Sequence, residues 1–393
     1  MAITCINEID IAGKMLFIRV DFNVPIADNA VKDDAKITAA LPTIRYAIEK
    51  GARVILASHL GRPKGKAVPE MSLALVAPLL SRLLGRAVVM APDCVGPAVA
   101  ALATKMQGGD CLLLENVRFH PEETENSPEF ARQLAGRADV YVNDAFGAAH
   151  RAHASTEGIA HVVKTAVCGF LMKKEIDYLI TALAAPVRPF VAIVGGAKVS
   201  DKIGVVKNLI NKVDALLIGG GMAYTFLKSK GYEVGKSLLE ADKVPVASDI
   251  LREARARKVE LLLPVDVVVA KEFAPDAEHQ VVDAQQIPPD WEAVDIGPRT
   301  IEAFARVIAT AKTIVWNGPV GVFEMPAFAQ GTAGVARAIV ASAAITIVGG
   351  GDSLAALRGL GLVDKVTHAS TGGGAMLELL EGKTLPGVAV LDR

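Results

Sequence analysis

The chain has 393 residues, of which 51% are hydrophobic and 22% are charged, and its formal net charge is −1. The length predicts two globular domains with large buried cores. The near-neutral charge argues against a nucleic-acid or membrane surface, because either needs an excess of basic residues. The four cysteines are scattered without C-x-x-C spacing, which indicates reduced core thiols in a cytoplasmic protein. We expect no signal peptide and no membrane-spanning segment.

Strand-like and helix-like runs alternate along the first 170 residues. Strands are predicted over residues 15–23, 53–61, 111–119 and 140–147. Helices are predicted over residues 41–51, 73–85 and 129–136. This alternation is typical of a doubly wound parallel sheet with helices on both faces.

The pattern changes near residue 170. Apolar residues from Leu171 to Leu183 follow helical spacing, and two prolines end that run. A second β–α series begins at Val191 and continues to about residue 370. We therefore predict an α/β protein with two doubly wound, Rossmann-like parallel-sheet domains, joined by a helix over residues 171–183 and with a cleft between them.

Four stretches of the second half share a short apolar run, a glycine cluster and a segment that can form a helix. They are residues 191–202, 215–226, 344–357 and 368–380. Glycine lets the backbone approach a ligand, and the N–H groups and dipole of the following helix favour an anion. Tight turns also use glycine for steric reasons alone, but four such loops favour a phosphate-bearing ligand at the carboxyl edge of a parallel sheet. Lys198 and Lys202, four residues apart, are expected to share a helix face there.

Basic side chains follow the predicted strands of the first half. They are Arg19, His59, Arg62, Arg118 and Arg151. The carboxyl ends of adjacent parallel strands converge on one crevice, where unpaired arginines are costly unless an anion fills it. We therefore expect a small, strongly anionic ligand. Each arginine could instead form a surface charge or an ion pair, with Asp21 or Glu115 as partner, and His59 could be a structural histidine.

Eight motifs occur in the order in which they occur in phosphoglycerate kinase. They are RVDFNVP, SHLGRP, LLENVRF, NDAFGAAHRAHAS, VGGAKVSDK, WNGPVGVFE, GGGDS and STGGGAMLELLEG. The chain thus resembles that family from about residue 3 to residue 390. The resemblance implies reversible, direct phosphoryl transfer from 1,3-bisphosphoglycerate to ADP in glycolysis, giving 3-phosphoglycerate and ATP. It also implies Mg²⁺ bound with ADP or ATP, closure of the two domains, and a cytoplasmic monomer.

The same resemblance assigns parts of the chain. Residues 1–170, with a tail of about residues 378–393, would bind 3-phosphoglycerate; residues 171–183 would connect the domains; residues 184–377 would bind the nucleotide. The expected substrate-binding residues are Arg19, Asp21, Phe22, Asn23, Lys36, His59, Leu60, Gly61, Arg62, Arg118 and Arg151, with Arg19 expected close behind the residues that face the substrate. The expected nucleotide-binding residues are Gly195, Gly196, Ala197, Lys198, Lys202, Gly219, Gly220, Asn317, Pro319, Val320, Glu324, Gly349, Gly350, Gly351, Asp352 and Ser353. The expected catalytic residues are Lys36, Lys198, Gly350 and Gly373, and Asp352 is the expected Mg²⁺ contact, acting mostly through the nucleotide phosphates.

Two positions depart from the family pattern. Lys36 stands where the family usually has arginine, which keeps the charge but loses the planar fork of donors. Ser353 stands where threonine is common, which keeps the hydroxyl group. Asp352 follows three glycines and could also be a helix N-cap.

Two other functions are compatible with parts of the sequence. An NAD-dependent dehydrogenase also uses glycine turns, but the G-x-G-x-x-G pattern is incomplete where it begins at Gly219, Gly349 and Gly372. A non-catalytic sensor of phosphorylated metabolites would have lost phosphate-binding residues, and Lys36 alone supports that hypothesis.

Overall fold

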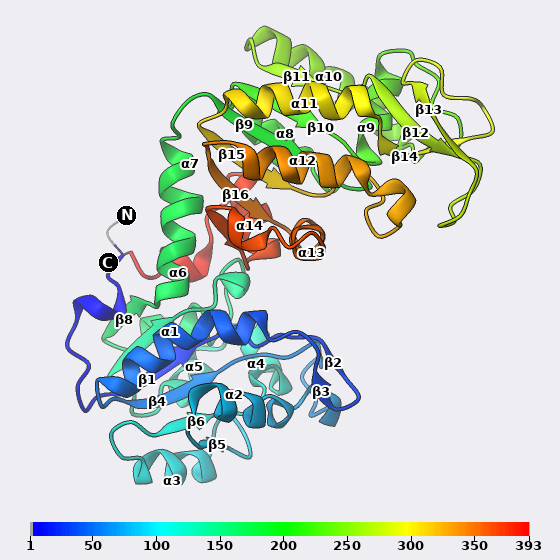
Figure 1. The fold of residues 1–393 in the computed structure, drawn as a ribbon. Helices are drawn as coiled ribbons and strands as arrows, with labels where there is room; N and C mark the ends of the chain where they lie inside the picture. The colour runs from blue at the N-terminus through cyan, green and yellow to red at the C-terminus, as the bar shows by residue number, and fades with distance from the viewer. Residues whose placement is uncertain (1–2, 393) are drawn as a thin grey trace. The chain divides into compact units, whose positions relative to one another are not determined.

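The computed structural model describes residues 3–392, which separate into two units. One unit comprises Met1–Asp177 together with Thr384–Arg393, and the other comprises Tyr178–Lys383. Residues 1, 2 and 393, which fall within the expected domain bounds, lie outside the described residues. Each unit is built around a six-stranded parallel sheet (Figure 1), so the predicted α/β class with two parallel sheets is confirmed.

The sheet of the first unit has the strand order β5-β6-β4-β1-β7-β8. Its strands are β1 (Met15–Arg19), β4 (Arg53–Ala57), β5 (Val88–Met90), β6 (Cys111–Leu113), β7 (Val140–Asn143) and β8 (Thr165–Cys168). All five residues of the central strand β1 are buried, as expected where helices cover both faces of a parallel sheet. The strands are shorter than predicted, because the chain leaves the sheet before the last residues of each predicted run, such as Asp21 and Asn23 after β1.

Helices and a small hairpin complete the first unit. The helices are α1 (Ala35–Glu49), α2 (Ala77–Leu84), α3 (Pro97–Lys105), α4 (Pro121–Thr124), α5 (Pro128–Ala135), α6 (Phe170–Glu175) and α15 (Pro386–Ala389). Helix α5 shows local control of its bounds: the Ser127 hydroxyl accepts the N–H of Phe130, and Gly136 ends the helix with a positive φ. The hairpin β2 (Ile26–Ala27) and β3 (Ala30–Val31) turns through Asp28 and Asn29, both with positive φ.

The sheet of the second unit has the strand order β11-β10-β9-β15-β16-β17. Its strands are β9 (Phe190–Val194), β10 (Ala215–Ile218), β11 (Glu260–Leu262), β15 (Thr313–Asn317), β16 (Ile345–Gly349) and β17 (His368–Ser370). The helices are α8 (Ile203–Ile210), α9 (Met222–Ser229), α10 (Val244–Ala256), α11 (Pro298–Thr310), α12 (Gln330–Ala341), α13 (Gly351–Gly359) and α14 (Gly373–Leu380). Helices α11 and α12 lie side by side (Figure 1). The strand order reverses between β9 and β15, which places a switch point there.

One segment of the second unit departs from the predicted β–α series. Strands β12 (Asp266–Ala270), β13 (His279–Asp283) and β14 (Glu292–Ile296) form a separate antiparallel sheet in the order β13-β12-β14. The expectation of uninterrupted β–α units to residue 370 is therefore wrong over this segment. No helix lies between these strands, so neighbouring strands run in opposite directions.

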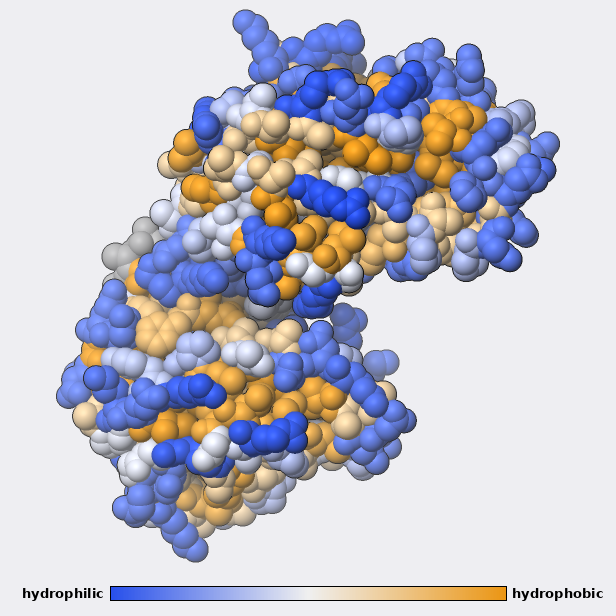
Figure 2. Space-filling view, in the orientation of Figure 1, coloured by the Kyte–Doolittle hydropathy of each residue, from blue (hydrophilic) through white to orange (hydrophobic). Residues whose placement is uncertain are grey.

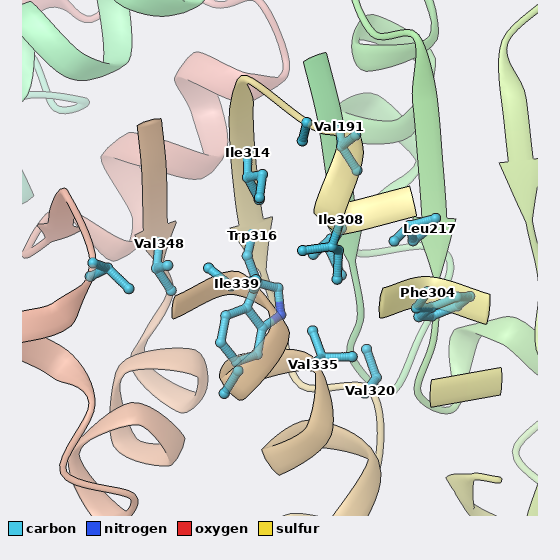
Figure 3. Packing of buried hydrophobic residues seen from close by; sticks show 14 of the residues in the cluster. Val191, Leu217, Phe304, Ile308, Ile314, Trp316, Val320, Val335, Ile339 and Val348 are labelled. Atoms are coloured by element: carbon cyan, nitrogen blue, oxygen red, sulfur yellow. The ribbon is translucent and has the colours of Figure 1, made fainter. Parts of the chain in front are cut away.

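The core of the second unit is centred on Trp316, which is fully buried. In Figure 3 its side chain projects from β15 towards Val335 and Ile339 of α12, with Val320 and Val348 nearby. The indole N–H donates to the Gly318 carbonyl over 2.7 Å, so the ring is buried without an unsatisfied donor. This core fixes the end of β15, from which the following loop leaves the sheet.

The predicted helix over residues 171–183 is helical throughout but not regular. It consists of α6, a π-helical segment (Ile176–Thr181) and α7 (Ala182–Ala184). The boundary between the two units falls inside the π-helical segment, between Asp177 and Tyr178. Such π turns within a helix are frequent at functional sites.

Within residues 3–392, no helix has both the length and the apolar composition that a membrane span requires. On the face drawn in Figure 2, hydrophilic and hydrophobic residues are mixed over both units.

Candidate functional site

A polar pocket of about 580 Å³ lies at the carboxyl edge of the first sheet. Loops that follow β1, β4, β6 and β7 supply most of its lining residues, and helices α1 and α4 supply Lys36 and Thr124. These include Asp21, Asn23, Lys36, His59, Gly61, Arg62, Arg118 and Arg151, all predicted from the sequence. The sequence prediction missed Pro63, Lys64, Gly65, Thr124, Gly147, Ala148, His150 and His153, which also line it. These residues lie near the predicted arginines in the sequence, and this proximity is the feature that could have indicated them.

Three guanidinium groups reach this pocket without a carboxylate partner. Within the described part of the chain, Arg62, Arg118 and Arg151 form no ion pair within 4.0 Å. Arg118 donates from Nη1 to the Gly61 carbonyl over 3.1 Å, while its buried Nε has no hydrogen-bond partner. Burial lowers the pKa of Arg118 to about 10, so the group is charged at neutral pH. A buried cationic donor without a partner favours an anion in this pocket.

Arg19, which the resemblance places close behind the substrate-facing residues, does not line the pocket. It is fully buried, and Nε donates to the Ser155 hydroxyl over 2.7 Å. That hydroxyl donates in turn to the fully buried Glu123 carboxylate over 2.6 Å. Burial raises the pKa of Glu123, although the Arg19 charge acts in the opposite direction. Arg19 therefore supports the pocket from behind, through a network that includes an acid the sequence prediction missed.

Phe22 and Leu60 are also absent from the pocket lining. Both side chains are buried, at 0% and 3% exposure. The Phe22 N–H donates to the Ser58 hydroxyl over 2.8 Å, so that donor already has a partner. These residues hold the loops that carry their polar neighbours.

The two carboxylates considered as arginine partners have other contacts. Asp21 accepts from Lys36 Nζ over 2.9 Å. Glu115 accepts from the Ser72 hydroxyl at 2.6 Å and from the Leu73 N–H at 2.8 Å. Because neither forms an ion pair with Arg62, Arg118 or Arg151, the alternative in which these arginines are structural ion pairs is wrong for this pocket.

His59 is both a structural and a pocket residue. Its ring is buried, and Nδ1 lies 3.1 Å from Nη2 of Arg19. Arginine can only donate, so Nδ1 accepts and Nε2 carries the proton. Burial holds the pKa of His59 well below its usual range. The neutral ring can therefore donate from Nε2 to an anion.

In the second unit, the predicted glycine loops lie at the carboxyl edge of the sheet. They follow β9, β10, β16 and β17, each of which precedes a helix, so this part of the prediction is confirmed. The loops after β9 and β15 flank the switch point and touch each other. A Cβ on Gly195 would lie 2.1 Å from the Pro319 carbonyl oxygen, so only glycine fits this close approach.

A chain of polar contacts joins three of these loops. Asn317 at the end of β15 accepts from Lys202 Nζ and donates to the Gly349 carbonyl over 2.9 Å. The Ser353 hydroxyl accepts the Gly318 N–H over 2.7 Å. Burial lowers the pKa of Lys202, while Asp201 and Asp352 act in the opposite direction. The contacts place the ammonium group of Lys202 beside the N-terminal end of α13.

Two sequence expectations about this edge are wrong in detail. Lys198 and Lys202 do not share a helix face, because residues 195–202 form a loop and α8 begins only at Ile203. Gly196 in this loop has φ +127°, a backbone conformation that a regular helix does not contain. The N-cap of α13 is Gly350 rather than Asp352, which lies in the first turn. A carboxylate there still interacts favourably with the helix dipole.

The remaining predicted nucleotide residues surround the same edge. Val320 is fully buried against the Trp316 core, while Pro319 is half-buried and Glu324 is exposed. The Gly220 N–H donates to the Val320 carbonyl over 2.9 Å. Gly373 is the first residue of α14, which follows β17. The expected residues that occupy loops of this edge are Gly195, Gly196, Ala197, Lys198, Lys202, Gly219, Gly220, Pro319, Val320, Glu324 and Gly350.

Comparisons with known proteins cover nearly the whole chain. The sequence model of the family described as phosphoglycerate kinase matches residues 6–383. A phosphoglycerate kinase from Moorella thermoacetica is 59% identical over 391 residues, which cover 100% of this chain and 99% of that protein. A cytosolic phosphoglycerate kinase from Triticum aestivum is 55% identical over 391 residues, which cover 98% of this chain and 97% of that protein.

Solved structures give the same result. The phosphoglycerate kinase structure from Coxiella burnetii superposes with a TM-score of 0.91 at 45% identity, covering 99% of this chain and 98% of that one. The structure from Pyrococcus horikoshii superposes with a TM-score of 0.86 at 35% identity, with the same coverage.

Proposed function

The chain belongs to the phosphoglycerate kinase family, and from this premise we propose which of its residues bind each substrate. It is a phosphotransferase with a carboxyl group as acceptor, and in glycolysis it transfers a phosphoryl group between 1,3-bisphosphoglycerate and ADP, giving 3-phosphoglycerate and ATP. This assignment excludes the NAD-dependent dehydrogenase. It also excludes the non-catalytic sensor, for which Lys36 was the only support.

We propose that the polar pocket of the first unit holds the glycerate substrate. The observation that carries this proposal is the set of three unpaired guanidinium groups, with an unpartnered buried Nε on Arg118. Guanidinium forks match both ends of 3-phosphoglycerate, a carboxylate and a phosphate. Asn23, His59 and Gly61 would add neutral contacts, and the buried Arg19 would orient His59 from behind.

The nucleotide would bind at the carboxyl edge of the second sheet. The N–H groups at the starts of α13 and α14, including those of Gly350, Gly351 and Gly373, would donate hydrogen bonds to phosphate oxygens. Lys198 and Lys202 would add charge. Gly195, Gly219 and Gly220 would border a flat base beside Pro319, and a Cβ at any of these three glycines would collide with a neighbouring loop. The exposed Glu324 would accept hydrogen bonds from the ribose hydroxyls.

A magnesium ion would be held mainly by the nucleotide phosphates, with Asp352 as the protein contact. The Asp352 carboxylate is exposed in the first turn of α13 and forms no hydrogen bond or ion pair within residues 3–392. Magnesium commonly binds through one or two carboxylates together with substrate phosphates, so this residue fits the ion. Magnesium would neutralise charge on the phosphate oxygens when it is bound.

The transfer itself needs no general base, because the attacking atom is a carboxylate or phosphate oxygen that is already ionised. The protein would position the two substrates in line and neutralise charge on the phosphoryl group, with Lys36 and Lys198 as the mobile cations. We propose direct transfer without a phosphoenzyme. A substrate with chiral phosphorus should give inversion of configuration, whereas retention would exclude a single displacement.

Binding on two units requires that the substrates meet. We therefore propose that the units close on each other, with residues 170–184 and adjacent loops absorbing the motion. We further propose a cytoplasmic monomer, in which Met1–Asp177 with Thr384–Arg393 binds the glycerate and Tyr178–Lys383 binds the nucleotide. Gel filtration with light scattering tests the monomer, and a dimer mass would contradict it.

A matched pair of variants tests the division of substrates. Arg118→Ala should raise KM for 3-phosphoglycerate, since it removes a charge-assisted contact worth roughly 1.5–3 kcal/mol, and should leave KM for ATP nearly unchanged. Lys202→Ala should have the opposite effect. A coupled assay of both reaction directions measures these constants. If Arg118→Ala changes only the nucleotide constants, the assignment of substrates to units is wrong.

A further inference from the structure

The loops that follow β5 and β6 bring three metal-ligating side chains together outside the polar pocket. The ligand atoms of Asp93, Cys94 and His120 all lie within 4.8 Å of one another. None of the three lines the polar pocket, and the phosphoryl transfer described above uses none of them. They supply three different donors, a carboxylate oxygen, a thiol sulfur and an imidazole nitrogen.

The sheet holds these residues in place. Strands β5 and β6 pair in parallel with Met90 opposite Leu113, so the loops at their carboxyl ends are neighbours. The Glu115 N–H donates to the Asp93 carbonyl over 3.4 Å, and the His120 N–H donates to the Val117 carbonyl over 3.3 Å. The two ligand-bearing loops are therefore anchored by backbone contacts that do not depend on the three side chains.

The side chains are already close to a ligating arrangement. His120 Nε2 lies 2.7 Å from Asp93 Oδ1, and Oδ1 also accepts the Cys94 N–H over 2.6 Å. Donor atoms in a tetrahedral zinc site stand about 3.3–3.6 Å apart, given bond lengths of about 2.0–2.3 Å. Shifts of about 1 Å would therefore suffice, which side-chain rotation supplies.

Charge and access also favour a cation. The Asp93 carboxylate, whose Oδ1 lies 2.7 Å from His120 Nε2, brings a negative charge to the three donors, and opposite charges attract. The side chains of His120 and Asp93 remain 29% and 48% exposed. This exposure lets a water molecule reach the ligand atoms as a fourth ligand.

We propose that Asp93, Cys94 and His120 form a binding site for a thiophilic divalent cation of the zinc class. On binding, the Cys94 thiol releases its proton to solvent and the sulfur forms the metal bond, while His120 ligates through the lone pair of Nε2. Thiolate and imidazole donors suit zinc, whereas magnesium prefers six oxygen ligands. The site is thus chemically distinct from the one proposed for the nucleotide's magnesium.

Cobalt(II) substitution tests the proposal directly, because a cobalt–thiolate bond gives a charge-transfer absorption band. Chelator-treated protein should bind one Co²⁺ per chain with that band, Zn²⁺ should displace it, and excess Mg²⁺ should not. Cys94→Ser should abolish the band and weaken Zn²⁺ binding, measured against a chromophoric chelator, by at least about 100-fold, since even indirect ligand contacts contribute about 10–100-fold.

Matched variants separate this site from the other thiols. Cys111→Ser removes a thiol of similar burial on β6, and Cys5→Ser removes one beside Cys168; both should keep the band. If Cys94→Ser does not fold, as judged by circular dichroism, His120→Gln at a half-exposed position should weaken Zn²⁺ binding and shift the band. Absence of a thiolate band in the parent protein, its persistence in Cys94→Ser, or its loss in either control would overturn the proposal.

Discussion

The Asp21 carboxylate shows how one residue of the polar pocket depends on its neighbours. Burial acts to raise its pKa, but the neighbouring basic groups, of which Lys36 contributes most, together outweigh burial, and the pKa falls to about 2. Lys36 is 32% exposed and lies at the start of α1. The lysine is thus tied to Asp21 before any substrate binds, and it has the reach to leave that partner for a phosphoryl group.

Replacement of Lys36 tests whether this residue stabilises charge during transfer. Lys36→Ala should lower kcat by about 10²–10³, the effect of losing one preorganised donor. Lys36→Arg should be at least as fast as the parent, because a guanidinium adds a second donor in a fixed plane. Steady-state ATP formation measures both. Lys32→Ala, an exposed lysine paired with Asp28, is the control and should have parental activity; a large loss in Lys36→Arg would show that the pocket has adapted to lysine.

At the scale of single elements, the start of α13 depends on one backbone conformation. Gly350 has φ +100° and ψ 137°, a region that side chains rarely adopt, and it is the N-cap of the helix. The neighbouring Gly351 is the first helical residue, and a Cβ there would meet nothing within 4 Å. A side chain is therefore expected to be unfavourable at Gly350 but tolerated at the adjacent Gly351.

This contrast predicts different stabilities for two conservative variants. Gly350→Ala should destabilise the second unit by about 1–3 kcal/mol, the cost of a non-glycine residue in such a conformation. Gly351→Ala should be neutral or slightly stabilising, because alanine is the better helix former. Thermal unfolding followed by circular dichroism measures both. Equal melting temperatures for the two variants would contradict the assigned backbone conformation.

The first turn of α6 is held by a hydrogen bond to a buried acid, Asp144. Asp144 is 1% exposed, and its Oδ1 accepts the N–H of Met172 over 3.0 Å. Burial raises the pKa of Asp144 from 3.8 to about 7, although its hydrogen bonds act in the opposite direction. The folded chain therefore keeps a proton here that the unfolded chain loses above about pH 4. Its stabilising contribution is full below that pH and is lost as the pH rises through about 7.

Asp144→Asn should flatten this pH dependence, because asparagine keeps the acceptor oxygen but never ionises. Between pH 5 and pH 8 the parent should lose about 3 kcal/mol more unfolding free energy than the variant. Urea unfolding at several pH values measures the difference. Asp10→Asn is the control, since this exposed carboxylate also accepts a backbone N–H, from Ala12. A parental slope in Asp144→Asn would contradict the raised pKa.

At the scale of the whole molecule, the proposed reaction predicts a change of shape. Small-angle scattering should show a smaller radius of gyration when 3-phosphoglycerate and a magnesium nucleotide are both bound, because closure brings the substrates together and excludes water. Either ligand alone should give a smaller change. Arg118→Ala at parental substrate concentrations should compact less, since fewer molecules hold the glycerate. An unchanged radius with both ligands at saturation would contradict closure.

The sequence by itself determined the family, the two parallel sheets and half of the residues that line the polar pocket. It could do so because β–α alternation repeats locally, and because Arg62, Arg118 and Arg151 lie in short motifs directly after strands. Parallel pairing then brings such positions to one edge whatever the details of packing.

Only the tertiary structure decided which of these side chains are buried and what they contact. Arg19 meets Ser155 across 136 positions of sequence, and Glu123 completes that network. The antiparallel sheet of β12, β13 and β14, the loop that separates Lys198 from Lys202, and the meeting of Cys94 with His120 are likewise set by long-range packing. Local periodicity carries no information on such contacts, because they arise between segments that become neighbours only when the sheets assemble.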